Sequence, residues 1–224
     1  KDLKEIRNSD LFKYSPYKTL TDDQYLVAKE IIDGVTRNEK ANFIIQGGPG
    51  TGKSIVATYL IKQLVDMGVN NVALVIAMTP LRNTFKKVFR GVPGLSANMV
   101  IGPSDAAKNK YDVVIVDETH RLRQRRNIPN FGTFDETNRQ LGLAQNADEL
   151  DWILQSSEKV ILFYDPKQSV RPSDIALEKI STLEAKRFTL ATQMRVKGGE
   201  EYITFIDKLL EGEDSPVPRF ESYD

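Results

Sequence analysis

Twelve residues, "FIIQGGPGTGKS" from Phe43 to Ser54, carry the clearest chemistry in this sequence. They fit the pattern G-x-x-x-x-G-K-[ST] and lie between a short β-branched run and a helical stretch, which is the context that a phosphate-binding loop requires. Backbone N–H groups of such a loop converge on phosphate oxygens, and the helix start adds positive potential. A chance glycine-rich turn is the weaker alternative. The loop is therefore expected to bind ATP through Gly48, Pro49, Gly50, Thr51, Gly52, Lys53 and Ser54.

Two carboxylates, Asp117 and Glu118, follow the apolar run Val113–Val116 directly. A buried strand that ends in carboxylates presents them at the sheet edge where ligands bind. We expect Lys53 to contact the β- and γ-phosphates, the Ser54 hydroxyl to ligate Mg²⁺, and Asp117 to hold the ion through water. Glu118 is expected to orient and deprotonate the attacking water, which favours ATP hydrolysis over phosphoryl transfer by a kinase. A solvated acidic turn is the alternative.

Two glutamines are further candidates. Gln168 follows the apolar run Val160–Tyr164 and could contact the γ-phosphate, although Asp165 and Pro166 before it are equally typical of a plain turn. Gln24 lies one helix before the first strand and could recognise adenine through its amide. The alternative for Gln24 is a capping box with Thr21, and chemistry alone leaves these two interpretations even.

Short β-branched runs that alternate with helical stretches must position these residues. The runs are apolar without alternation in the middle of the chain, as in strands covered on both faces. This order predicts an α/β domain with a mostly parallel central sheet of about five strands and right-handed crossovers. Thr21–Val35 is expected to be a helix, and Arg121–Ala147 lacks clear periodicity, as in a long loop. The expected strands are Asn42–Gln46, Val72–Ala77, Val113–Val116, Val160–Tyr164 and Arg187–Leu190.

The composition limits the possible partners. Lys plus Arg equals Asp plus Glu at 31 each in 224 residues, so any nucleic-acid surface must be a local patch. The chain has no Cys, which excludes disulfides and thiolate metal sites and is compatible with a cytoplasmic location. No apolar run reaches the roughly 18 residues of a membrane span, and no signal peptide is evident, so no membrane partner is expected.

Five segments carry a resemblance to a known family. "LTDDQ", "GGPGTGKS", "VDETH", "YDPKQS" and "ATQMR" occur in the order of the Q motif and motifs I, II, III and IV of superfamily 1 helicases. From about Leu20 to Leu210 the chain is similar to helicase-like ATPases of the Schlafen type. The resemblance implies a RecA-like three-layer α/β/α fold with ATP and Mg²⁺ as cofactors. It also implies that Gln24 recognises adenine, Gln168 senses the γ-phosphate and Arg195 touches it. A plain surface residue is the alternative for Arg195.

The resemblance further implies a division of the chain. Residues 1–20 form a lead-in, residues 21–210 form the RecA-like ATPase domain, and residues 211–224 form a linker or a truncated end. The chain begins at Lys1 without Met and is expected to be a piece of a larger protein. Motifs V and VI, and the second RecA-like domain with its arginine finger, are absent from this sequence. The isolated chain is therefore expected to bind ATP but to hydrolyse it slowly.

A basic helix face is the candidate nucleic-acid surface. Arg82, Lys86 and Arg90 recur at i, i+4 and i+8, with no acidic residue nearby. In the helicases that this chain resembles, the loop after the corresponding strand, motif Ia, touches single-stranded nucleic acid. Thr79, Arg82 and Lys86 are therefore candidates for phosphate contacts. An ordinary solvated helix face is the alternative.

A second basic run, His120 to Arg126, follows the two carboxylates. It could bind a polyanion or link the nucleotide state to the segment beyond it. Pairing with acidic residues of the same chain is the alternative, and is favoured for Arg123, Arg125 and Arg126. His120 sits where ATPases of this kind couple their ATP and nucleic-acid sites.

The sequence therefore favours the ATP-hydrolysing domain of a translocase or remodeller of DNA or RNA. Single-stranded DNA or RNA, and the second RecA-like domain, are its expected partners. The alternative is an ATP-driven regulatory switch that controls a fused or partner nuclease or defence module without translocation. A P-loop kinase is disfavoured by Glu118 and Gln168.

Overall fold

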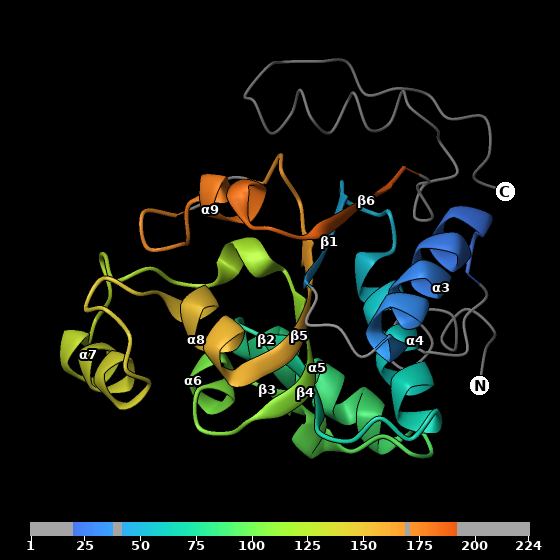
Figure 1. Ribbon diagram of the computed structural model, residues 1–224, viewed down its shortest axis with the longest axis horizontal. Helices are drawn as coiled ribbons and strands as arrows, with labels where there is room; N and C mark the ends of the chain where they lie inside the picture. The colour runs from blue at the N-terminus through green and yellow to red at the C-terminus, as the bar shows by residue number, and fades with distance from the viewer. Residues whose placement is uncertain (1–19, 38–41, 169–170, 192–224) are drawn as a thin grey trace, which may run out of the picture.

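A parallel β-sheet forms the centre of the computed structural model, which describes residues 20–37, 42–168 and 171–191 (Figure 1). Its six strands are ordered β3-β2-β4-β5-β1-β6, and every pair of neighbours is parallel. The strands are β1 (Asn42–Gly47), β2 (Val72–Ile76), β3 (Val100–Ile101), β4 (Tyr111–Asp117), β5 (Ser157–Tyr164) and β6 (Lys186–Leu190). The α/β fold class expected from the sequence is confirmed.

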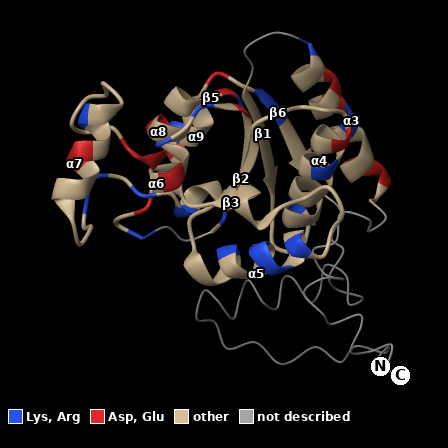
Figure 2. Cartoon of the chain, turned by 90° about the horizontal axis from the view of Figure 1, so that it is seen from below, with Lys and Arg blue, Asp and Glu red and all other residues tan. Residues whose placement is uncertain are grey.

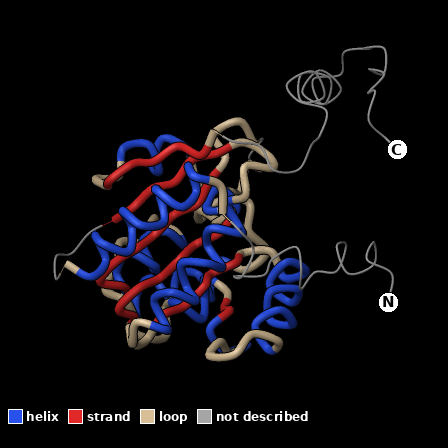
Figure 3. Tube along the Cα trace, turned by 90° about the vertical axis from the view of Figure 1, so that its right-hand side faces the viewer, coloured by secondary structure: helices blue, strands red, loops and turns tan. Residues whose placement is uncertain are grey.

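Helices cover both faces of this sheet (Figures 1 and 3). Residues of α3, α4 and α5 pack on one face, and residues of α6, α8 and α9 pack on the other. Along β4, Val113 and Ile115 face the first layer, whereas Val114 and Val116 face the second. This two-sided burial explains why the strands read as unbroken apolar runs. The helices are α3 (Asp22–Thr36), α4 (Lys53–Asp66), α5 (Thr79–Arg90), α6 (Pro103–Ala106), α7 (Phe131–Gln140), α8 (Glu149–Ser156) and α9 (Leu177–Thr182).

Two features differ from the expectation. The sequence analysis missed β3, because a strand of two residues leaves no apolar run to detect. The prediction of one long loop over Arg121–Ala147 was wrong, since the helix α7 lies within this segment. Within α7 only Phe134 and Asn138 are buried, so the helix has almost no apolar periodicity.

The parallel strands bring the predicted motifs to one edge of the sheet. Each strand of a parallel sheet ends at the same edge, where ligands bind in open α/β folds. The phosphate loop follows β1, Thr79 lies shortly after β2, Asp117 ends β4, and Gln168 lies four residues beyond β5. Within the described ranges, no helix is both long and apolar enough to cross a membrane.

Candidate functional site

The phosphate loop connects the end of β1 to the start of α4. Gly50 and Gly52 have φ values of 80° and 82°, in the left-handed region that glycine adopts at little cost, and Gly52 is the N-cap of α4. The Lys53 ammonium is buried and donates hydrogen bonds to the carbonyl oxygens of Gly47 at 2.6 Å and Gly48 at 2.9 Å. The carbonyl groups of the phosphate loop therefore fix the position of the Lys53 side chain.

The candidate metal ligands lie together, although they are 63 positions apart in the chain. The Ser54 hydroxyl donates to Asp117 Oδ2 at 2.6 Å, and Asp117 is fully buried at the end of β4. Burial raises the pKa of Asp117 from 3.8 to about 6, and the charge of Glu118 adds to the increase, while the Ser54 hydrogen bond and the Lys53 charge oppose it. A bound cation beside Asp117 would add to the positive charge of Lys53 and would stabilise the ionised form of this buried carboxylate.

The side-chain oxygens of Ser54 and Asp117 are suitable ligands for a magnesium ion that arrives with a nucleotide. Among the described residues, no group of three or more His, Cys, Asp or Glu side chains is arranged to hold a metal ion. Mg²⁺ commonly takes only one or two protein oxygens and completes its shell with phosphates and water. The Ser54 and Asp117 oxygens match that requirement, and they lie beside the phosphate loop.

Glu118 has an unusual backbone conformation for a residue with a side chain. Its φ is 54° and its ψ is 48°, in the left-handed region, and such strain is concentrated at functional sites. Its N–H donates to Asp117 Oδ1 at 3.0 Å, and its Oε2 lies 3.0 Å from His120 Nε2. Burial raises the pKa of Glu118, but the hydrogen bond and charge of His120 and the charge of Lys53 outweigh burial and lower it overall. Glu118 is thus an ionised carboxylate near neutral pH.

His120 links Glu118 to Gln168. The histidine is fully buried, and its Nδ1 accepts the backbone N–H of Asp165 at 3.4 Å. Since a backbone N–H can only donate, Nε2 carries the ring hydrogen when the imidazole is neutral. That hydrogen faces both Glu118 Oε2 and Gln168 Oε1, each 3.0 Å away. Arg121 Nη2 donates to the same Gln168 oxygen at 3.0 Å and its Nη1 donates to Asp174 Oδ2 at 3.3 Å.

Gln24 contacts both the start of α3 and the phosphate loop. The capping box is confirmed, because Gln24 Oε1 accepts the Thr21 N–H at 3.0 Å and the Gln24 N–H donates to Thr21 Oγ1 at 3.4 Å. Its Nε2 also donates to the Thr51 carbonyl of the phosphate loop at 2.9 Å. Gln24 is 1% exposed. Adenine recognition by this amide stays a prediction.

Of the candidate nucleic-acid residues, Thr79 and Arg82 are hydrogen-bonded to each other, and Lys86 lies further along α5. Arg82 donates to the Ile76 carbonyl at 2.8 Å and to Thr79 Oγ1 at 3.0 Å, so it connects the end of β2 to the start of α5. Lys86 lies one turn further along α5, a helix with basic but no acidic residues (Figure 2). Thr79 and Arg82 line a hollow of about 590 Å³. Three more arginines line the same hollow, namely Arg121, Arg123 and Arg171.

Of the three arginines for which intramolecular pairing was favoured, Arg123 and Arg125 are confirmed to be paired. Arg123 Nε and Nη2 donate to Glu149 Oε1 at 2.9 Å and 2.7 Å, and the Arg123 N–H donates to Glu149 Oε2 at 2.8 Å. Glu149 is fully buried, and burial raises its pKa despite these hydrogen bonds. Arg125 forms an ion pair with Asp135 of α7.

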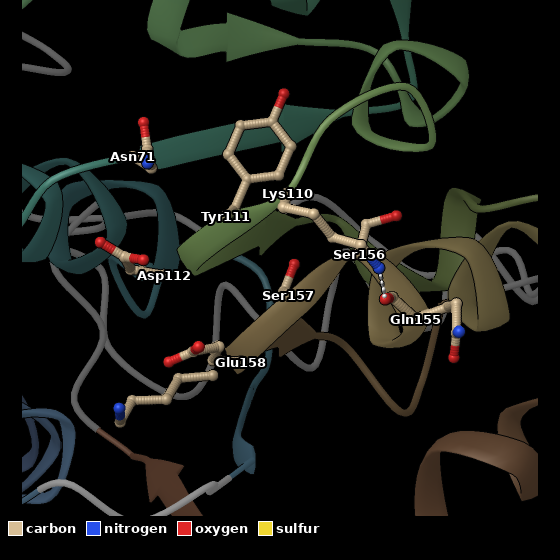
Figure 4. A pocket seen from close by; sticks show the side chains of 9 residues that line it. Asn71, Lys110, Tyr111, Asp112, Gln155, Ser156, Ser157 and Glu158 are labelled. Carbon is tan, nitrogen blue, oxygen red and sulfur yellow. Dashed lines mark hydrogen bonds between the residues drawn. The ribbon is translucent and has the colours of Figure 1, made fainter. Parts of the chain in front are cut away.

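Another hollow, of about 570 Å³, lies at the opposite edge of the sheet (Figure 4). It is formed where β4 and β5 begin, and Tyr111, Asp112 and Ser157 are among the residues that line it. The hydroxyl of Ser157 is buried there without a hydrogen-bond partner. None of the residues predicted from the sequence to form a site lines this hollow.

One predicted site residue, Arg195, lies outside the described residues. The sequence analysis missed the contacts of Arg121 with Gln168 and Asp174, for which the only signal was the position of Arg121 three residues after Glu118.

An all-parallel sheet, a phosphate loop between β1 and α4, and carboxylates at the end of β4 define a helicase-like α/β P-loop domain. The chain belongs to the Schlafen group 3 DNA/RNA helicase domain family, whose model matches residues 40–224. A search of curated proteins found no match.

Solved structures with a similar fold include Pif1 helicases. Pif1 from Candida albicans has a TM-score of 0.50 and 18% identity over 90% of this chain and 45% of that chain. A Pif1 structure concerned with unwinding of forked double-stranded DNA has a TM-score of 0.46 and 17% identity over 86% of this chain and 48% of that chain. Domain III of Thermotoga maritima DnaA has a TM-score of 0.45 and 12% identity over 93% and 78% of the two chains. The chain thus spans about half the length of these Pif1 chains, and at such identities the likeness concerns the fold alone.

Proposed function

We propose that this chain is the ATP-binding and ATP-hydrolysing domain of a superfamily 1 helicase-like translocase or remodeller of DNA or RNA. One observation carries the proposal: the phosphate loop, the Ser54–Asp117 pair and the Glu118–His120–Gln168 network meet at one edge of the sheet. Membership of the helicase-domain family supports the same function. A cytoplasmic location and a RecA-like ATPase domain over residues 21–210 belong to this proposal.

In the proposed binding step, Lys53 exchanges its two carbonyl partners for oxygens of the β- and γ-phosphates. The carbonyl groups hold the ammonium near its working position, so little rearrangement is needed. Ser54 would hold Mg²⁺ directly and Asp117 would hold it through water, and the ion would supply positive charge against that developing on the phosphates. Gln24 recognises the adenine ring from α3.

In the proposed hydrolysis step, Glu118 orients the attacking water and accepts its proton. The water oxygen bonds to the γ-phosphorus, the bond from that phosphorus to the β,γ-bridging oxygen breaks, and ADP and phosphate are the products. The amide of Gln168 contacts the γ-phosphate, and Arg195 supplies part of the positive charge. A second RecA-like domain supplies the remaining charge, since an arginine provided in this way accelerates GTPases about 10³–10⁵-fold.

In the proposed nucleic-acid site, the strand runs over the amino-terminal part of α5 and the hollow beside it. Thr79, Arg82 and Lys86 contact phosphates there. Arg121 lines the same hollow and donates to Gln168, so it is positioned to connect the strand to the nucleotide. This shared residue is the structural support for coupling between the two sites.

One observation favours the alternative of a regulatory switch. Arg82 is held by the chain's own carbonyl groups and Arg123 by Glu149, so these two cations of the hollow already have protein partners. Such a switch would hydrolyse ATP without responding to a polynucleotide.

The deciding test is steady-state ATP turnover of this chain with and without oligothymidylate or polyuridylate, with Glu118→Gln as the inactive control. A severalfold increase with either polymer supports the translocase or remodeller. Turnover that both polymers leave unchanged, together with no binding of a fluorescent oligonucleotide, contradicts it and favours the switch.

A further inference from the structure

Asp165 has a buried carboxylate oxygen that lacks a partner. The residue directly follows β5 and is fully buried. Its Oδ1 accepts the Lys167 N–H at 3.0 Å, which explains the turn after the strand. Its Oδ2 is buried without a hydrogen-bond partner. An unmade hydrogen bond to a buried charged group is costly, and native proteins contain few of them, so this atom requires an explanation.

The strand register places Asp165 beside the phosphate loop. Gln46 is paired with Tyr164, so Asp165 lies beside Gly47, the first residue of the phosphate loop. Val116 is paired with Leu162 on the other side of β5, so Asp165 also lies close to the end of β4. Asp165 therefore sits between the phosphate loop and the strand that carries the predicted metal ligand.

The alternation of β5 indicates which way the side chain points. Tyr164 packs in the cluster that contains residues of α8 and α9, and Phe163 packs in the cluster that contains residues of α4. Successive residues of a strand point to opposite faces, and we infer that this alternation continues one residue past the end of β5, which puts the Asp165 side chain on the face of Phe163. Asp117 is on that face too, since it bonds Ser54 of α4.

The missing partner must be a hydrogen-bond donor, because an ionised carboxylate only accepts. Phosphate oxygens are excluded, since they are also acceptors and carry negative charge. The Lys53 ammonium donates to the carbonyl oxygens of Gly47 and Gly48, and in the proposed function it turns from them to the β- and γ-phosphates, so it has other partners in both states. A water molecule bound to Mg²⁺ is a suitable donor, because Mg²⁺ retains several waters and their hydrogens point outward.

We propose that Asp165 is a third carboxylate of the nucleotide site and that its Oδ2 accepts a hydrogen bond from a water of the magnesium shell. Asp165 thus acts on the metal from a second layer and does not bind it directly. This inference rests on the proposed function and adds a positioning residue from the segment after β5. Through this water, a nucleotide bound together with Mg²⁺ would also be connected to the turn that carries Gln168.

The test is calorimetric titration of the 224-residue chain with ADP, in Mg²⁺ and in EDTA. Asp165→Asn retains the shape and the Oδ1 acceptor but turns an NH₂ group toward the outward hydrogens of the metal-bound water. We expect the affinity in EDTA to stay within about twofold of the parent. The gain in affinity from Mg²⁺ should fall about tenfold, equivalent to about 1.4 kcal/mol. Asp112→Asn, at the opposite edge of the sheet, is the matched control and should keep the full gain.

The outcomes separate the explanations. If Asp165→Asn keeps the full magnesium gain, or loses affinity equally with and without Mg²⁺, the inference is wrong. If the parent chain binds ADP in neither condition, the proposed function itself fails. Thermal unfolding without nucleotide is the second measurement. An unfolding midpoint no lower than that of the parent supports the inference, whereas a clear decrease would assign Oδ2 to a structural water and overturn it.

Discussion

Replacing Asp117 by asparagine should stabilise the metal-free protein while weakening its binding of magnesium. Asp117 is fully buried and carries its charge beside that of Glu118. Functional sites often contain such destabilising charges, because the ligand relieves them. The substitution removes the charge and keeps the size of the side chain, so the cost of burying this charge becomes measurable.

The structure gives the magnitude. Raising the pKa of Asp117 from 3.8 to about 6 corresponds to about 3 kcal/mol of destabilisation when the group is ionised. The aspartate accepts hydrogen bonds from the Ser54 hydroxyl and the Glu118 N–H, and the single oxygen of asparagine can keep one of them. Losing the other costs about 1 kcal/mol. The expected net gain is about 2 kcal/mol, or about 4–8 °C in Tm for a chain of this size.

The sign of the pH dependence follows from the raised pKa. Above about pH 6, Asp117 is ionised in both the folded and the unfolded protein, and the destabilisation is complete. As the pH falls from 6 toward 3.8, the folded protein takes up the proton first and the destabilisation declines. The stability advantage of Asp117→Asn should therefore be largest at about pH 7.5. Near pH 5 about half of the charge penalty is gone, so the net advantage should fall from about 2 to about 0.5 kcal/mol.

The assay is thermal or urea unfolding in EDTA at several pH values, with Asp112→Asn as the control for a change of charge alone. Saturating Mg²⁺ and ADP should reverse the order, because the parent then gains binding energy that the variant lacks. A variant that is less stable than the parent at neutral pH, or an advantage that grows as the pH falls, would refute the reasoning that the buried Asp117 charge destabilises the metal-free protein.

Three further predictions concern binding and pairing. Lys53→Ala should abolish ADP binding in calorimetry, because it removes the cation that neutralises the phosphates; unchanged affinity would contradict the phosphate-loop assignment. Lys86→Glu should weaken oligonucleotide binding and reduce its salt slope by about 0.7–0.9, whereas Lys87→Glu on the adjacent face should do so less. Equal effects of the two would indicate a general charge effect. Arg123→Ala should lower the free energy of unfolding by about 2 kcal/mol, because it leaves a buried carboxylate unpaired while Arg123 itself is partly exposed. The exposed Arg126→Ala should change it little, and equal losses would show that the pair is unimportant.

Local chemistry made much of the site predictable. The phosphate loop and the pair Asp117 and Glu118 are short patterns whose residue types suit phosphate and metal binding, and both were recognised from the sequence. The parallel topology then brings them together without further information. The strands were predictable for a related reason, since burial on both faces leaves continuous apolar runs such as Val113–Val116.

Features that depend on distant partners were not predictable. The helix α7 is held by the buried Phe134 and Asn138, and two residues give no periodic signal. The contact of Arg121 with Gln168 joins residues 47 positions apart, and the Arg123–Glu149 pair joins residues 26 apart. For Gln24, the sequence could not show that the amide oxygen caps α3 while the amide nitrogen donates to the distant Thr51 carbonyl, and adenine recognition stays a prediction.

The most direct test of the central claim is the comparison of the parent chain with Glu118→Gln in nucleotide binding and in phosphate release. Glutamine keeps the shape of the side chain but cannot accept the proton of the attacking water. We expect unchanged affinity for ADP and Mg²⁺ together with a loss of ATP turnover of about 100-fold or more. If Glu118→Gln releases phosphate at the parental rate, Glu118 is not the catalytic carboxylate and the proposed ATPase mechanism is contradicted.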